Sequence, residues 1–294
     1  MLIDFLKVLI LSIVEGVTEF LPVSSTGHLI LVNQFVKLEP QDFSNAFNII
    51  IQLGAILSVL VIYFNRLNPW DLEKTAKYFP RNYDKLNKQS RFYYRIKHPD
   101  TTTMDLWLKV IVGIIPAMVL GLLFDDIIDA YLFNPMTVAA MLFLWGLIII
   151  FVEKRNQNKD GFVQDNLANV SYKTVLMIGL FQCLAMIPGT SRSAATIMGA
   201  MILGLSRQAA AEFSFFLAIP TMLGATALKL VKNLHGFTAY QWFLILLGMV
   251  LSFIVAYFVI KKFLAYVKNH DFIIFGAYRI ILSILVFAYF LILG

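Results

Sequence analysis

The sequence has few charged residues and a single cysteine. Asp, Glu, Lys and Arg together make up 14% of the 294 residues, whereas hydrophobic residues make up 59%. The mean hydropathy is +0.76, which excludes a soluble domain with an ordinary charged surface. The one cysteine, Cys183, excludes an intrachain disulfide framework. The composition therefore predicts a chain whose solvent is the lipid bilayer.

Long hydrophobic runs take the place of the missing charges. A helix needs about 20 largely apolar residues to cross the hydrocarbon layer, which is ~30 Å thick. Six runs meet that requirement, at 46–64, 106–124, 135–152, 209–231, 240–260 and 272–293. Two further apolar stretches, 2–36 and 175–205, contain a proline, polar residues and charges in the middle. We interpret each of these two as a broken helical hairpin.

The positive charge of the chain is concentrated between the hydrophobic runs. The formal net charge is +6, and ten of the 24 Lys and Arg residues lie at 66–109. Segments 154–173 and 261–268 are also basic, whereas 125–135 holds acids without Lys or Arg. Because basic loops stay in the cytoplasm, we expect both termini to lie outside, with Lys229 and Lys232 as exceptions on the outer side. The charge thus indicates membrane topology and not a nucleic-acid partner.

The two halves of the chain share a pattern. An offset of 166 residues superimposes Pro22 on Pro188, Ser25 on Ser191 and Phe47 on Phe213. Because the two copies enter the membrane from opposite faces, they form an inverted repeat. The predicted fold is an all-α integral membrane protein, a single polytopic domain over 1–294 with two re-entrant helical hairpins and about six full transmembrane helices. The first repeat covers 1–152, with a cytoplasmic loop at 65–105, and the second covers 172–294.

The first hairpin carries two acidic residues at helical spacing. Glu15 and Glu19 are four residues apart, so on a helix they share one face with Cβ atoms about 5–6 Å apart. Two like charges inside a membrane protein persist most reasonably when a cation or a shared proton joins them. The alternative is a pair of glutamates that face water at a helix end. The apolar neighbours favour the first interpretation.

The tip of the first hairpin combines a helix break with hydroxyl groups. Pro22 stops the helix, and a new helical stretch follows a small polar segment made of Ser24, Ser25, Thr26 and Gly27. Free N–H groups at a helix start attract an anion, so this segment is predicted to bind phosphate. His28 lies one helical turn after Ser25 and would serve as acid or base. Taken singly, each residue is better explained without a function, Ser25 as an ordinary N-cap and His28 as an interfacial histidine.

The second tip repeats the proline break and adds an arginine. Pro188 precedes Ser191, Arg192 and Ser193, and a helix follows. The planar guanidinium of arginine suits phosphate oxygens, so Arg192 is predicted to hold phosphate, with Ser191 and Ser193 as further phosphate-binding residues. The alternative is an arginine that reaches water or pairs with a glutamate. Elsewhere, Arg207 and Glu212 are predicted to form a structural pair, and Arg279 needs an internal partner or an interface.

Both tip motifs resemble those of a known family. The segments EGVTEFLPVSSTGH at 15–28 and PGTSRS at 188–193 are similar to the signatures of the bacterial undecaprenyl pyrophosphate phosphatases, also known as bacitracin-resistance proteins. The likeness extends over 47–57, 113–124, 182–186, 212–227 and 277–279, and the divergent stretch is 71–103. By this resemblance, Glu15 and Glu19 are the acidic pair of the family, and Ser25, His28 and Arg192 are its nucleophile candidate, histidine and arginine.

The resemblance implies an enzyme of the bacterial plasma membrane. Such an enzyme converts undecaprenyl pyrophosphate and water to undecaprenyl phosphate and inorganic phosphate, which recycles the carrier for cell-wall synthesis and confers bacitracin resistance. It implies an extracytoplasmic active site and a divalent cation, Mg²⁺ or Ca²⁺, which we expect Glu15 and Glu19 to hold. The partners are the lipid substrate and the membrane lipid, and a homodimer stays open.

Two mechanisms and one rival function stay open at this point. Ser25 attacks the phosphorus with Glu19 or His28 accepting its proton, or a water attacks while Ser25 binds phosphate. The rival is a transporter or flippase of a polyprenyl phosphate lipid, because inverted repeats are also a transporter architecture. The Arg-Pro pair and Ser-Gly-His run of an acid-phosphatase-type site are absent from the sequence, which excludes that site.

Overall fold

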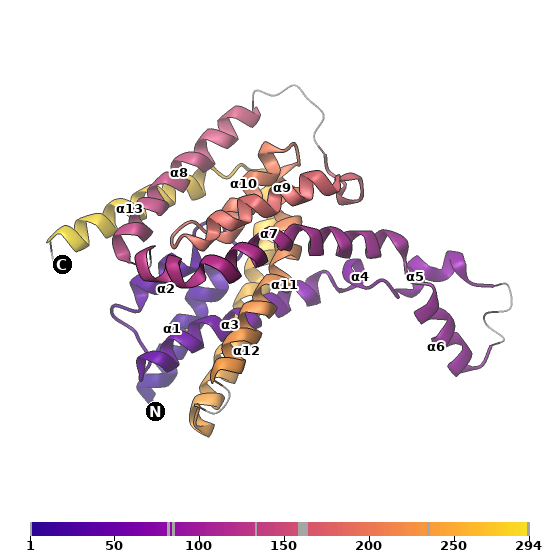
Figure 1. The fold of residues 1–294 in the computed structure, drawn as a ribbon, viewed down its shortest axis with the longest axis horizontal. Helices are drawn as coiled ribbons and strands as arrows, with labels where there is room; N and C mark the ends of the chain where they lie inside the picture. Colours follow the sequence, from indigo (N-terminus) through magenta and orange to yellow (C-terminus); the bar gives the residue numbers. More distant parts are fainter. Residues whose placement is uncertain are drawn as a thin grey trace.

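The protein is helical throughout the part of the chain that the structure describes. The computed structural model describes residues 2–80, 83, 86–132, 134–157, 164–233 and 236–292 (Figure 1). Among these residues, the extended structure is limited to one isolated bridge between Gln164 and Leu205. The predicted all-α class is therefore confirmed.

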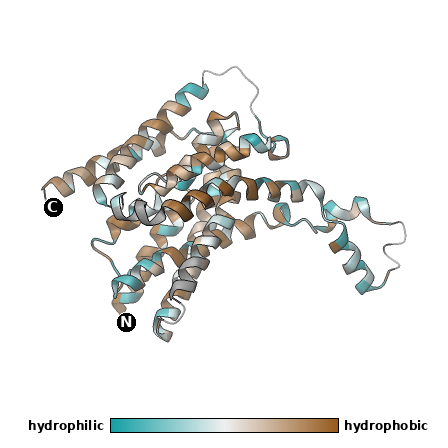
Figure 2. Cartoon of the chain, in the orientation of Figure 1, coloured by the Kyte–Doolittle hydropathy of each residue, from teal (hydrophilic) through white to brown (hydrophobic). Residues whose placement is uncertain are grey.

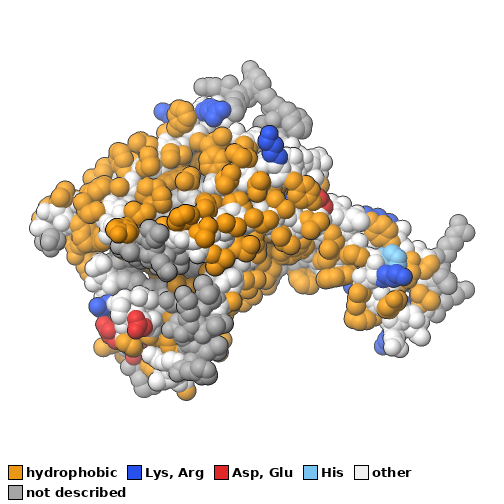
Figure 3. Space-filling model, in the orientation of Figure 1, with side chains coloured by type: hydrophobic (Ala, Val, Ile, Leu, Met, Phe, Trp, Pro, Cys, Tyr) orange, Lys and Arg blue, Asp and Glu red, His pale blue; other side chains and the backbone are white. Residues whose placement is uncertain are grey.

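Within the described part of the chain, six helices are long and apolar enough to cross a membrane, as the hydrophobic runs predict. They are α3 (Gln41–Ile62), α7 (Thr101–Leu132), α8 (Pro135–Gln157), α11 (Arg207–Asn233), α12 (Ala239–Val267) and α13 (Ile273–Ile292). Hydrophobic side chains cover much of the visible outer surface of this bundle (Figure 3), and most of the ribbon of α8 and α13 has the colour of hydrophobic residues in Figure 2. Leu122 and Leu246, for example, expose 79% and 61% of their surface. So much exposed apolar surface is compatible with lipid around the helices and not with water.

The two broken hairpins consist of shorter helices. The first unit has α1 (Leu2–Thr18) and α2 (Ser25–Val32) in contact with each other. In the second unit α9 (Tyr172–Cys183) continues as a 3₁₀ turn (Leu184–Met186), and α10 (Arg192–Ile202) packs against both. The breaks fall at Pro22 and Pro188, as the sequence predicts. Whether the chain enters and leaves the membrane on one side at each unit stays a prediction.

The two tips have the same local geometry, one residue out of the predicted register. Ser24 and Ser191 are the two non-glycine residues with positive φ in the described chain, at 74° and 75°. Each caps the helix that follows, since Ser24 accepts a hydrogen bond from the Gly27 amide and Ser191 accepts one from the Ala194 amide. Ser191 therefore corresponds to Ser24 and not to Ser25, because the second tip is one residue longer between its proline and its cap.

The helices of the two halves of the chain are interlocked. Helix α1 packs along α12, and α9 packs along α7, so the first helix of each half lies against the other half. Helices α3 and α11 also contact each other, as do α8 and α13. The tips are thereby surrounded by protein, where an irregular backbone can be tolerated inside a membrane.

An arm connects α3 to α7. It contains α4 (Phe64–Leu67), α5 (Leu72–Thr75), a 3₁₀ turn (Ala76–Tyr78) and α6 (Lys88–Lys97), and it extends away from the bundle in Figure 1. Its base is fastened by Lys77, whose Nζ lies 3.2 Å from Asp100 Oδ1, and by Lys74, which donates to Thr103 Oγ1 at 3.0 Å. The arm contains most of the divergent segment 71–103, whose last three residues form the start of α7.

The predicted pair of Arg207 and Glu212 is wrong. Arg207 pairs with Glu153, with Nη2 2.6 Å from Oε2, and Glu212 pairs with Arg66. Residues five apart on a helix point about 140° away from each other, so each side chain meets a different neighbouring element. The side chains of Asp125, Asp126, Asp129, Lys229 and Lys232, which bear on the predicted outer face, lie outside the described residues.

The crossing of α8 and α13 depends on two facing glycines. A Cβ at Gly146 would lie 2.8 Å from the Gly276 carbonyl oxygen and 2.7 Å from Ile280 Cγ1. Because backbone atoms cannot move aside, we expect Gly146→Ala to destabilise the protein by about 1–3 kcal/mol. Thermal unfolding in detergent measures this loss. The matched control is Gly121→Ala in α7, where a Cβ would meet nothing within 4 Å and the change should stay within about 1 kcal/mol. Equal stability of the two variants would contradict the tight crossing.

Candidate functional site

Glu19 and Ser25 are joined across the break of the first hairpin. Glu19 follows the end of α1, and Ser25 is the first residue of α2. The hydroxyl of Ser25 donates a hydrogen bond to the carboxylate oxygen Oε2 of Glu19. Both residues are buried, with Glu19 6% and Ser25 8% exposed, so little water competes for this hydrogen bond. A carboxylate in this position can accept the proton of the serine hydroxyl.

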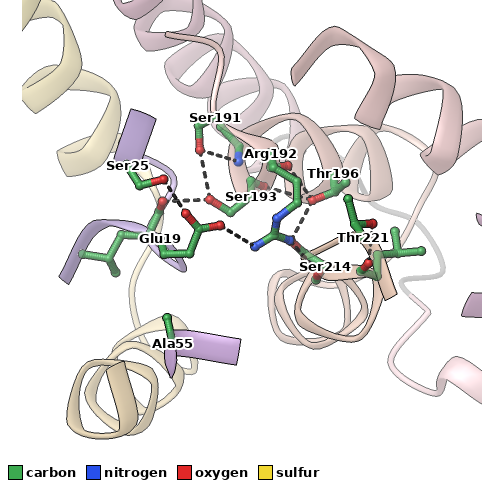
Figure 4. A network of polar contacts seen from close by, with 12 residues as sticks. Glu19, Ser25, Ala55, Ser191, Arg192, Ser193, Thr196, Ser214 and Thr221 are labelled. Atoms are coloured by element: carbon green, nitrogen blue, oxygen red, sulfur yellow. Dashed lines mark hydrogen bonds and ion pairs between the residues drawn. The ribbon is translucent and has the colours of Figure 1, made fainter. Parts of the chain in front are cut away.

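Arg192 reaches the same carboxylate from the second hairpin (Figure 4). Its Nη2 lies 3.4 Å from Glu19 Oε1, and its Nη1 donates to the Ser214 carbonyl oxygen at 2.8 Å. The third guanidinium nitrogen, Nε, is buried and has no hydrogen-bond partner in the described part of the chain. The Glu19 carboxylate is thus shared between a serine of one tip and an arginine of the other. The structure brings together three of the four predicted catalytic residues.

Hydroxyl groups also tie the two tips to each other. Ser193 Oγ donates to the Leu21 carbonyl oxygen at 2.8 Å, which links α10 to the first tip. Ser191 Oγ lies 3.0 Å from Ser193 Oγ and caps α10. Behind Arg192, the hydroxyls of Thr196 and Ser214 are 2.7 Å apart. Ser214 was missed by sequence reasoning, and its signal is a serine directly after Phe213, one of the residues matched between the two halves.

Amide groups at the two tips offer an anion site. The first amides of α2, at Ser25 and Thr26, have no acceptor within their own helix, and the same holds for Arg192 and Ser193 at the start of α10. Both helix N-termini carry partial positive charge and lie beside the shared carboxylate. Ser24 and Gly27, which were both predicted to bind phosphate, form a hydrogen bond with each other: Ser24 Oγ accepts from the Gly27 amide at 3.2 Å. This hydrogen bond shapes the tip.

The imidazole of His28 points to partners other than the Ser25 hydroxyl. Its Nδ1 lies 2.7 Å from the Ser24 carbonyl oxygen, and its Nε2 lies 2.6 Å from the hydroxyl of Tyr278. The imidazole also stacks on the Tyr278 ring, with centroids 5.7 Å apart. Because Ser25 turns toward Glu19, the helical spacing of Ser25 and His28 does not bring their side chains into contact. Tyr278 is a neighbour of the tip that sequence reasoning missed, because 250 residues separate it from His28.

Glu15 is a buried carboxylate without a hydrogen-bond partner. It is fully buried, and neither of its carboxylate oxygens has a hydrogen-bond partner among the described residues. The charges of Glu19 and Arg192 are close enough to act on the Glu15 carboxylate, so Glu15 belongs to the same cluster. Among the described residues no group of three or more His, Cys, Asp or Glu forms a cage for a metal ion. Two carboxylates of this kind nevertheless suit a hard cation that takes its remaining ligands from phosphate oxygens and water.

Gln182 is a second buried polar residue that sequence reasoning missed. It lies on α9, it is 3% exposed, and both polar atoms of its side chain lack a hydrogen-bond partner. The offset that aligns Ser24 with Ser191 also aligns Glu15 with Gln182. An alignment of the two halves with this offset would have pointed to Gln182. Thr190 Oγ1 in the second tip is likewise buried and without a partner.

Fold and site together define a polytopic helical membrane protein with a buried acid, serine and arginine cluster where two broken helical units meet. The family model described as "Bacitracin resistance protein BacA" matches residues 8–285. The chain belongs to this family.

The similar proteins cover the chain almost from end to end. Undecaprenyl-diphosphatase 1 of Clostridioides difficile (strain 630) is 50% identical over 293 residues, which are 99% of this chain and 98% of that protein. The undecaprenyl-diphosphatase of Fusobacterium nucleatum subsp. nucleatum is 51% identical over 95% of this chain and 98% of its own length. That of Enterococcus faecalis is 47% identical over 97% and 96%. The divergence noted at 71–103 therefore does not prevent full-length similarity.

The second tip requires glycine at position 189. Gly189 has φ +91°, and a Cβ there would lie 2.6 Å from the Val138 carbonyl oxygen of α8. We expect Gly189→Ala to lower the free energy of unfolding by about 1–2 kcal/mol because of the left-handed backbone. The contact with α8 should lower it by about 1–3 kcal/mol more. Gly204→Ala is the control, because Gly204 has φ +100° and nothing within 4 Å of an added Cβ. Thermal unfolding should rank Gly189→Ala well below Gly204→Ala, and equal losses would exclude the contact with α8.

Proposed function

We propose that this chain hydrolyses undecaprenyl diphosphate to undecaprenyl phosphate and inorganic phosphate at the cluster of Glu15, Glu19, Ser25 and Arg192. The observation that carries the proposal is the Glu19 carboxylate, which accepts from the Ser25 hydroxyl and contacts the Arg192 guanidinium of the other tip. Relatives about 50% identical over nearly the full length are named undecaprenyl-diphosphatase, which supports the same reaction. The reaction would recycle the lipid carrier of cell-wall synthesis and confer bacitracin resistance.

In the proposed first step, the Ser25 oxygen attacks the terminal phosphorus of the diphosphate. The hydroxyl proton passes to Glu19, and the bond between this phosphorus and the bridging oxygen breaks. The bridging oxygen and its electron pair leave with undecaprenyl phosphate. Arg192 and the first amides of α2 and α10 stabilise the charge on the transferring phosphoryl group.

In the second step, water attacks the phosphoserine and releases inorganic phosphate. The proton that Glu19 took from Ser25 first passes to the departing undecaprenyl phosphate, so Glu19 is a carboxylate again. Glu19 then takes a proton from the attacking water and gives it to the Ser25 oxygen as the bond between phosphorus and this oxygen breaks. The water mechanism is the alternative, with Glu19 accepting a proton from a water that attacks directly while Ser25 binds a phosphate oxygen. In both mechanisms Glu19 is the base, because it already accepts the hydrogen bond of Ser25.

A divalent cation, Mg²⁺ or Ca²⁺, is part of the proposal. Glu15 and Glu19 would hold it, and the fit rests on the two buried carboxylate oxygens of Glu15 that lack partners. When bound, such a cation neutralises charge on the diphosphate. His28 is assigned a supporting role, because its two ring nitrogens contact Ser24 and Tyr278. Ser24, Thr26, Gly27, Ser191 and Ser193 would shape and line the phosphate site.

The proposal includes the architecture that the sequence predicts. Units α1–α2 and α9–α10 would be re-entrant hairpins, and the two halves of the chain would form an inverted repeat. The matching caps at Ser24 and Ser191 support this, as does the exchange in which α1 lies on α12 and α9 on α7. The site would face the extracytoplasmic side of the bacterial plasma membrane. A lipid transporter is less well supported, because reversible anion binding does not require a serine bonded to a carboxylate.

Substitution of Glu19 and substitution of Glu15 should change the kinetics in different ways. Glu19→Gln keeps the shape of the side chain but removes the base, so kcat should fall by about 10²–10⁴-fold at saturating Mg²⁺. Glu15→Gln removes a proposed cation ligand only, so it should raise the Mg²⁺ concentration that gives half-maximal rate. Phosphate release from undecaprenyl diphosphate by the purified protein, titrated with metal and with chelator, measures both effects. Identical metal dependence in Glu15→Gln and wild type would remove Glu15 from the cation site.

Ser25 decides between the two mechanisms. If Ser25 is the nucleophile, Ser25→Ala should release no phosphate, and rapid quenching of the wild type should trap a phosphoserine in the peptide that contains residue 25. The control is Ser58→Ala, a buried serine of α3 whose hydroxyl donates to the Ala55 carbonyl oxygen and which should stay active. Substantial turnover by Ser25→Ala would support the water mechanism instead.

A further inference from the structure

Arg279 is a permanently charged side chain buried in the middle of the bundle. It lies on α13 and is 0% exposed, which makes it one of the largest fully buried side chains in the described chain. Six ion pairs are found among the described residues, and none of them includes Arg279. A charged group without a carboxylate partner in a membrane-spanning helix is costly, so its retention calls for a role.

All of the hydrogen bonds of Arg279 go to backbone carbonyl oxygens. Its Nη2 donates to Gly189 at 2.7 Å and to Thr190 at 3.0 Å, both in the second tip. Its Nη1 donates to Pro22 in the first tip at 3.2 Å. Longer contacts of 3.4 and 3.5 Å reach Met141 and Leu142 on α8. One guanidinium therefore touches both tips and the helix behind them.

These carbonyl groups lie next to the reacting side chains in the sequence. Pro22 is midway between Glu19 and Ser25, and Thr190 is two residues before Arg192. Because a few backbone bonds separate each contact from a functional side chain, a displacement of either tip would move Ser25 and Glu19 relative to Arg192. A planar group with five N–H donors can hold several carbonyls at fixed angles, whereas an ammonium group on one nitrogen cannot.

We propose that Arg279 is a positioning residue that holds the two tips in register for phosphoryl transfer, without contact to the substrate. We call the hydrogen bonds from Arg279 to both tips the clamp. Its kinetic consequence rests on the proposed function, whereas its effect on the positions of the two tips does not. Helix α13 is a suitable base for such a clamp, because it packs closely along α8 where Gly146 and Gly276 face each other. The hydrogen bond of 2.7 Å from Ser283 to the Ala139 carbonyl oxygen is one further contact between these helices. The preceding residue, Tyr278, contacts His28 of α2 and adds a third point of attachment.

The kinetic test compares three variants of the full-length protein in detergent. Arg279→Met removes the donors and should lower kcat about 100-fold, because small misplacements of reacting groups have effects of that size. KM for undecaprenyl diphosphate should stay near the wild-type value, since Arg279 binds no substrate. Arg279→Lys keeps the charge but not the planar guanidinium with its five N–H donors, so its kcat should lie between those of Arg279→Met and wild type. Ser283→Ala removes one bond between α13 and α8 and should leave kcat unchanged.

Hydrogen–deuterium exchange tests the clamp without reference to activity. In Arg279→Lys, which keeps a cation in the bundle and so guards against loss of folding, amides at 21–27 and at 188–194 should both exchange faster than in wild type. Ser283→Ala should change neither segment. Unchanged exchange at either tip, or a wild-type kcat in folded Arg279→Lys and Arg279→Met, would overturn the proposal. If the wild type releases no phosphate, the proposed function fails, while the exchange result still decides the clamp.

Discussion

The contact between Glu19 and Arg192 sets the conditions for the rest of the molecule. Both side chains are almost entirely inside an apolar bundle, where an unpaired charge is far less stable than in water. Because Glu19 belongs to the first broken unit and Arg192 to the second, neither charge is balanced unless the two tips meet. The folding of the bundle is thereby linked to the assembly of the site.

Such a meeting needs a backbone that is irregular in the middle of a helical protein. Ser24 and Ser191 adopt positive φ, and each satisfies a free amide of the following helix with its own hydroxyl. Protein surrounds this backbone because α1 lies along α12 and α9 along α7. The carbonyl groups that the breaks release are taken up by Arg279, so one cation satisfies groups of both tips. The site is thus formed at a place where helices end, which leaves amides available for an anion.

Local patterns in the sequence predicted the parts of the structure that depend on local forces. Hydrophobic runs of sufficient length predicted the six described helices that are long and apolar enough to cross a membrane, and Pro22 and Pro188 predicted the breaks. The convergence of Glu19, Ser25 and Arg192 could be predicted because the hydroxyl, acidic and cationic residues stand at the tips of two similar units. Their roles in catalysis and cation binding stay predictions until they are measured.

Contacts between distant segments could not be predicted in the same way. The partner of Arg207 is Glu153 and not Glu212, because the fold and not the helix decides which acid is near. His28 was expected to face Ser25, but Tyr278 from the last helix takes its Nε2. Ser25 was matched with Ser191, whereas the caps match Ser24 with Ser191. The one extra residue in the second tip cannot be recognised without the geometry of the caps.

The central claim is that side chains from both tips act as one unit on a lipid diphosphate. A double-mutant cycle on phosphate release tests it most directly, with Glu19→Gln, Arg192→Gln and the double variant measured against undecaprenyl diphosphate at saturating Mg²⁺. We expect the double variant to be about as slow as the slower single variant, because residues of one catalytic unit are not additive. Losses in log kcat/KM that simply add would show that the two tips act independently and would contradict this account.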